Sequence, residues 1–155
     1  MEKNSGFYRK NEKGQSFVEL GLSMVFLLIL LAAVIDLGWA FFTMIALRDA
    51  AQEAATVGSI CPTDSTKIRE RLLSSASTPI DTSKLSTSQI DICVVSPGSQ
   101  TCGASVALGN SVQVSITYEH KIVTPFVGSF IGTQNYPLTV RAADTILRLN
   151  CEAIQ

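Results

Sequence analysis

The stretch Gly14-Gln-Ser-Phe-Val-Glu19, followed without a break by an apolar run from Leu20 to Ile35, decides the fold of this chain. The run contains no charged residue and no proline, and its apolar side chains fall on every face of a helix, so no polar stripe suits a soluble surface helix. A membrane-spanning helix needs about 20 mostly apolar residues. Residues 17–47 supply them, with Glu19 and Asp36 as the interior charges. We therefore predict a membrane-spanning helix; a buried core helix of a soluble protein is the alternative.

The charges that flank the apolar run predict its orientation. Residues 1–14 carry four basic and two acidic residues, whereas residues 48–60 carry one basic and two acidic residues. Because Lys and Arg gather on the cytoplasmic side of a span, we expect a cytoplasmic N-terminus and an outward segment from residue 48 to residue 155. A secretory signal peptide is the competing interpretation, but its apolar core should be only about 7–15 residues long. Here the apolar character continues past Ala32-Ala33.

The helix is expected to continue beyond the membrane. Residues 40–57 are rich in alanine, a strong helix former, and Gly58 and Ser59 resemble a C-terminal stop. A helix over residues 15–57 would be about 65 Å long. Its first half would span the bilayer, and its second half would form the spine of an outer domain. The predicted organisation is a basic cytoplasmic leader (1–14), a transmembrane and spine helix (15–59) and an extracytoplasmic α+β domain (60–155).

The N-terminal residues show a pattern that resembles a known class of proteins. A basic leader that ends in Gly14, an apolar helix that starts at once, and Glu19 as the fifth residue after that glycine together resemble the type IV prepilin class. The longer stretch over residues 14–58 resembles the TadE family of pilin-like proteins, which belong to the machinery that assembles tight-adherence (Flp-type) pili. The major pilins of those pili are little more than the helix, whereas this chain adds about 100 residues. The resemblance therefore implies a minor pilin or pseudopilin.

The resemblance also implies partners and a processing step. A prepilin peptidase would cut between Gly14 and Gln15, and the processed chain would meet other pilin-like subunits and the pilus assembly platform. Cleavage would create an α-amino group four residues before Glu19, and Glu19 of one subunit would neutralise that amine on a neighbour. An ionised carboxylate in the hydrocarbon is costly and is usually paired or functional. The alternative for Glu19 is a solvated position at the cytoplasmic interface, where it complements the positive end of the helix.

Asp36 is the second charge in the apolar segment, 17 residues after Glu19. At a rise of about 1.5 Å per residue, the two carboxylates lie near opposite sides of the bilayer core. We expect Asp36 at the outer interface of the membrane. A polar contact with a partner helix is the alternative.

Four cysteines lie in the outward segment, which predicts two disulfides with three possible pairings. Cys93 and Cys102 flank a turn-rich connection, which favours a local bridge and leaves Cys61 to pair with Cys151 near the C-terminus. Free thiols are an alternative. A zinc site is disfavoured because the spacings lack Cys-x-x-Cys and His120 is the single histidine.

We predict an α+β fold for the outward segment. We expect a long N-terminal transmembrane and spine helix packed on a small antiparallel sheet of three or four strands. Alternating apolar residues predict strands, and periodicity of about 3.6 residues predicts helices. The expected elements are a helix over 66–76, a loop over 77–88, strands over 89–96, 104–108, 111–119 and 136–149 with a bulge near 142–144, and a short helix or wide loop over 124–132.

Several function classes find no support in the sequence. A net charge of −1 gives no basic footprint for nucleic acid. No nucleophile elbow, phosphate loop or His-Glu-x-x-His pair is present, and His120 in Glu119-His120-Lys121 is expected to be a solvated strand-end residue. We therefore expect no enzymatic activity, no catalytic residue, no metal and no cofactor. The expected protein is a pilus assembly component of the cytoplasmic membrane or of an extracellular pilus; the alternative is a membrane-anchored surface-binding domain outside any filament.

Overall fold

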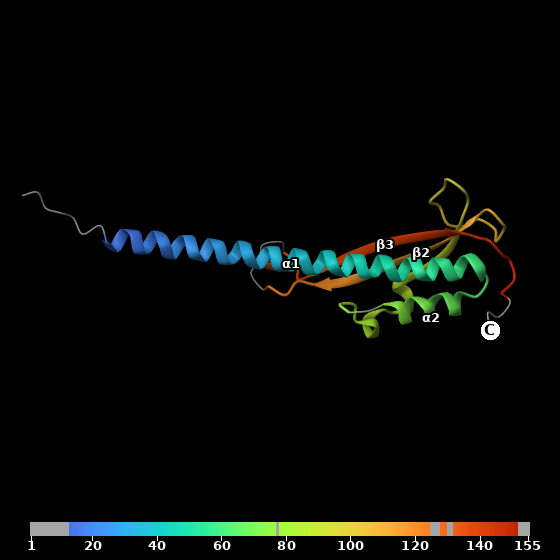
Figure 1. The fold of residues 1–155 in the computed structure, drawn as a ribbon, viewed down its shortest axis with the longest axis horizontal. Helices are drawn as coiled ribbons and strands as arrows, with labels where there is room; N and C mark the ends of the chain where they lie inside the picture. The colour runs from blue at the N-terminus through green and yellow to red at the C-terminus, as the bar shows by residue number, and fades with distance from the viewer. Residues whose placement is uncertain (1–12, 77, 125–127, 130–131, 152–155) are drawn as a thin grey trace, which may run out of the picture.

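A computed structural model of the chain describes residues 13–76, 78–124, 128–129 and 132–151. One long helix, α1 (Lys13–Ile60), is followed by α2 (Ser65–Ser75), the 3-10 turns η1 (Thr82–Lys84) and η2 (Thr87–Gln89), and the strands β1 (Ile90–Val95), β2 (Ser111–Lys121) and β3 (Asn135–Thr145). Figure 1 shows the second half of α1 lying against the sheet and α2, while its first half projects alone. The α+β fold with a long spine helix is confirmed.

The sheet is antiparallel with the order β1-β2-β3. The inner side chains of β2, Val112, Val114 and Ile116, are fully buried, and they face α1 as the alternation of residues 111–119 predicts. On α1 the buried residues recur every three or four positions, as one helix face requires; they are Asp36, Thr43, Leu47, Ala50, Ala51, Ala54, Ala55, Gly58 and Ser59. The same core contains Ile68 and Leu72 of α2 and Ile80 and Leu85 of the following segment, together with further sheet-side residues, Ile90, Tyr118, Val140, Ala142 and Ile146. The alanines allow the helix to lie close to the sheet.

The helix stop predicted at Gly58 and Ser59 lies close to the observed end, because α1 ends one residue later, at Ile60. A Cβ atom at Gly58 would lie 2.7 Å from Cγ1 of Val112, so this glycine allows α1 to approach β2 closely. The helix ends just before Pro62, a residue that cannot continue a helical hydrogen-bond pattern. The glycine is thus required by packing and does not terminate the helix.

The edge strand predicted over residues 104–108 is wrong. The backbone N–H groups of Gly103 and Ala104 both donate to the carbonyl oxygen of Val94, at 3.1 and 3.0 Å. Two consecutive N–H groups that share one acceptor turn the chain away from the ladder, because a strand directs successive N–H groups to opposite sides. Among the described residues, pairing on this side of β1 is limited to one isolated bridge between Val95 and Cys102.

The last strand ends at Thr145 and has no bulge. Its register with β2 is unbroken from Ser111 opposite Thr145 to Lys121 opposite Asn135. Beyond the strand, the N–H group of Leu147 donates to the carbonyl oxygen of Ser59 at 2.8 Å, so the chain leaves the sheet and bonds to the end of α1. The apolar phase change that suggested a bulge marks the end of the strand.

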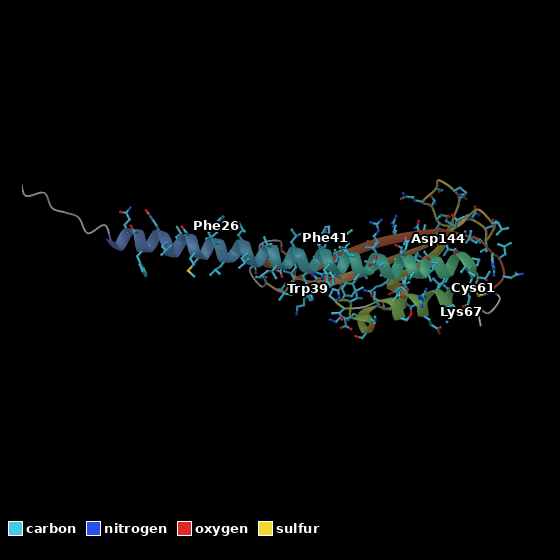
Figure 2. All side chains as sticks on the ribbon, viewed as in Figure 1. Phe26, Trp39, Phe41, Cys61, Lys67 and Asp144 are labelled. Atoms are coloured by element: carbon cyan, nitrogen blue, oxygen red, sulfur yellow. A yellow bond between two sulfur atoms is a disulfide. The ribbon has the colours of Figure 1, made fainter. Side chains whose placement is uncertain are left out.

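Both disulfides are formed, as Cys61–Cys151 and Cys93–Cys102, which are the pairs that the spacing favours. The first ties the end of α1 to the C-terminal segment, and the second ties β1 to the loop that follows it. Figure 2 labels Cys61 at the end of α1 farthest from its N-terminus. The short helix or loop predicted over residues 124–132 falls largely outside the described residues.

Candidate functional site

The first half of α1 is a bare apolar helix. Every side chain from Gly14 to Leu31 is exposed, with Phe17 at 79% and Leu22 at 74%. Figure 2 shows Phe26 on the part of α1 that projects beyond the sheet. Within the described part of the chain, α1 is the one helix long and apolar enough to cross a membrane. Residues 14–35 extend about 33 Å along the axis, close to the bilayer core of about 30 Å. The helix therefore fits a single-pass membrane anchor.

Glu19 lies near the N-terminal end of this bare segment, and its side chain is exposed. The Gln15 side-chain amide donates to Oε1 of Glu19 at 3.4 Å, one helical turn away. Among the described residues, Glu19 has no cation within ion-pair distance. The Gly14–Gln15 bond, the predicted cleavage site, lies in the first turn of α1, at the same end of the helix as Glu19.

Asp36 stands where the bare helix meets the domain. Its side chain is only 8% exposed, and its Oδ2 accepts a hydrogen bond at 3.1 Å from the backbone N–H of Thr124, 88 positions later in the sequence. Sequence reasoning considered the membrane interface and a partner helix, and missed this contact within the chain. No local pattern signals it, because the two residues meet only when β2 packs on α1. This hydrogen bond joins Thr124, which follows β2, to the part of α1 where the bare apolar segment ends.

His120 is buried, so its assignment as a solvated residue is wrong. It continues the inward alternation of Ile116 and Tyr118 toward α1 and is only 7% exposed. That alternation was the signal that could have placed it. Burial lowers the pKa of the His120 imidazole, and the negative charge of Asp36 opposes this effect in part.

Asp36 and His120 line an apolar groove of about 540 Å³ between α1 and the sheet. The other lining residues are Ala33, Leu37, Ala40, Phe41 and Met44 from α1, and Ile122, Tyr136 and Leu138 from the sheet side. Figure 2 shows Trp39 and Phe41 on α1 where the sheet begins. If residues 14–35 span the bilayer, the groove lies at one of the two interfaces between the membrane and water.

The buried imidazole gives the fold a pH dependence. In the folded chain the pKa of His120 lies below its ordinary value of 6.5, so the unfolded chain binds the proton more readily. The contribution of neutral His120 to the free energy of unfolding should be complete above pH 6.5 and should decrease as the pH drops below that value. We expect the urea midpoint of the full chain in detergent to fall between about pH 7.5 and about pH 5, and His120→Gln to remove part of that fall. Identical pH profiles for the two chains would refute this assignment.

One cluster of possible metal ligands occurs in the described residues, formed by Asp91, Cys93 and Cys102. Both sulfur atoms belong to the disulfide, and metals bind the thiolate form of cysteine. Asp91 alone would remain as a ligand. The cluster therefore does not form a metal centre.

Comparison with protein-family models gives a match at the N-terminal part of the chain. The model of the TadE-like protein family matches residues 14–56, which make up most of α1. No curated protein and no solved structure matches the chain significantly. The match ends before α2 and the sheet, so it concerns the long helix and not the remainder of the fold. Over residues 14–56 this chain is therefore similar to the TadE-like protein family.

Proposed function

We propose that the protein is a minor pilin or pseudopilin that takes part in assembly of a tight-adherence-type pilus. In this proposal α1 spans the cytoplasmic membrane with its N-terminus in the cytoplasm, and the sheet lies outside. A prepilin peptidase cuts after Gly14, and the processed chain then joins other pilin-like subunits at the assembly platform.

The observation that carries the proposal is the division of α1 into a bare apolar half and a docked half. Full burial of one large apolar side chain contributes about 1.5–3 kcal/mol, and this segment carries more than ten of them exposed. Such a helix needs either lipid or other apolar helices around it. A bundle of like helices offers the same apolar surroundings as the bilayer, so a subunit can pass from membrane to filament while its outer domain stays folded. The TadE-like match over the same residues supports this role.

In this proposal, Glu19 sets the position of each subunit along its neighbour in the filament. Its carboxylate has no cation among the described residues of its own chain, and cleavage after Gly14 leaves a cationic amine on Gln15. Pairing between Glu19 of one subunit and the amine of a neighbour would satisfy two charges that are costly in an apolar bundle. Subunits out of register would leave both charges unpaired.

The substitution Glu19→Ala tests this role. We expect the chain to be made and processed normally, and its amount in sheared pili to fall at least about tenfold, since an unpaired ion in an apolar setting costs several kcal/mol. Asp49→Ala is the matched control, because Asp49 is an exposed carboxylate on the docked half of the same helix. The measurement is the ratio of the chain in pilus and membrane fractions. Normal incorporation of Glu19→Ala would refute the register role.

The intact mass of the native protein from both fractions tests the proposal as a whole. A chain that begins at Gln15 and is found with sheared pili is the expected result. A chain that keeps residues 1–14 where the peptidase is active, and stays out of pili, would instead favour a membrane-anchored surface-binding domain. A chain that begins near Val34 would indicate an ordinary secreted protein.

A further inference from the structure

The sheet face opposite α1 carries a second pocket of about 290 Å³, lined by both polar and apolar residues. The register places Ser111, Gln113 and Arg141 on this outer face, alternating with the inner residues of β2 and β3. The loop that follows β1 forms the other wall, with Ser96, Pro97, Gly98, Ser99 and Gln100. Figure 1 shows this loop at the end of the sheet distant from the N-terminus of α1. The pocket is thus turned away from both the anchor helix and the membrane.

Gln113 is a buried amide that has no partner within the described chain. Its side chain is only 8% exposed, and it makes no hydrogen bond to any described residue. Among those residues, every fully covered side-chain nitrogen or oxygen atom has a partner, so the polar atoms of the Gln113 amide are not fully covered. Gln113 lines the cavity, so we infer that its amide is accessible from there. Buried polar side chains are normally hydrogen-bonded, and an open one at the base of a pocket points to a ligand.

Arg141 adds an available positive charge. Its side chain is exposed, and no described carboxylate lies within ion-pair distance of it. The carboxylate in the same cross-strand row is Asp91, which is separated from Arg141 by Ser115 on the middle strand. Two strand spacings amount to about 10 Å, too far for a direct pair. The guanidinium is therefore free to bind an anion.

We propose that this pocket binds a sugar that bears a carboxylate group, as in an acidic polysaccharide. The guanidinium of Arg141 can hold a carboxylate with two parallel hydrogen bonds. The Gln113 amide and the hydroxyl groups of Ser96 and Ser111 can donate to and accept from ring hydroxyl groups. The volume lies at the lower limit of small-molecule pockets, about 300 Å³, and fits a single ring. An inorganic anion would satisfy Arg141 alone, and a neutral sugar would leave Arg141 unpaired.

The test is a nuclear magnetic resonance titration of the full chain in detergent micelles, with both disulfides intact. Glucuronic acid, glucose and inorganic sulfate are the three probes, and the side-chain amide signal of Gln113 is the readout. We expect glucuronic acid to shift that signal with a dissociation constant of about 1 mM and glucose to bind at least about tenfold more weakly. Equal binding of glucose, sulfate binding as tight as that of glucuronic acid, or no shift with glucuronic acid would each overturn the proposal.

Two variants connect the binding to the pocket. Arg141→Gln should weaken glucuronic acid binding about ten- to a hundredfold, because it removes a charge-assisted pair. Arg148→Gln is the matched control, an exposed arginine outside the pocket lining, and should bind as the original chain does. Gln113→Glu should abolish binding by placing a carboxylate against the ligand. If Gln113→Glu fails to fold, Arg141→Gln still decides, because its side chain is exposed; unchanged binding there would refute the site.

Discussion

Replacement of both cysteines in Cys61→Ser/Cys151→Ser is expected to cost the outer domain about 4–5 kcal/mol of its free energy of unfolding, in the chain-entropy model. The bridge joins residues 90 positions apart, so it removes much of the freedom of the unfolded chain. It also reinforces a contact of the folded state, because the N–H of Leu147 already bonds to Ser59 beside Cys61. The measurement is urea unfolding followed by circular dichroism, in detergent and without reductant.

The second disulfide provides the control. Cys93 and Cys102 are only 9 positions apart, and the same model gives about 3 kcal/mol for a loop of this length. The double serine variant at these positions should therefore be less destabilised than the first. A larger loss for the short loop would contradict the entropic account and would indicate that contacts between β1 and its loop dominate.

Gly58→Ala is expected to destabilise the chain by about 1–2 kcal/mol, although alanine is the better helix former by about 1 kcal/mol. The added Cβ would lie 2.7 Å from Cγ1 and 3.0 Å from Cβ of Val112, and the χ1 angle of a β-branched valine is restricted. Either α1 or β2 must shift to accept it. Gly58→Val should be worse, because its two further carbon atoms enter the same space.

Gly38→Ala is the matched control for that overlap. It also replaces a glycine of α1 with alanine, but nothing lies within 4 Å of the new Cβ atom. We expect this variant to be neutral or stabilised by up to about 1 kcal/mol. Equal stability changes at Gly38 and Gly58, measured by the same urea unfolding, would refute close packing as the reason for the glycine at position 58.

The sequence alone determined what depends on neighbouring residues. The uninterrupted apolar run of residues 20–35 identified the anchor, and the alternation from Val112 to Tyr118 identified the central strand and its buried face. The turn-rich spacing between Cys93 and Cys102 favoured the local disulfide, which left the long one. Hydropathy, periodicity and short loop closure are encoded within about one element, so they can be read without knowledge of the fold.

The tertiary structure alone decided what depends on how elements meet. The contact between Asp36 and Thr124 spans 88 positions, and the role of Gly58 follows from its distance to Val112 on another element. The pocket of Gln113 and Arg141 requires the register of β2 with β3 and the loop after β1. Each of these contacts is fixed only by docking of elements far apart in the chain, and local preferences carry no information on the distance between two such elements.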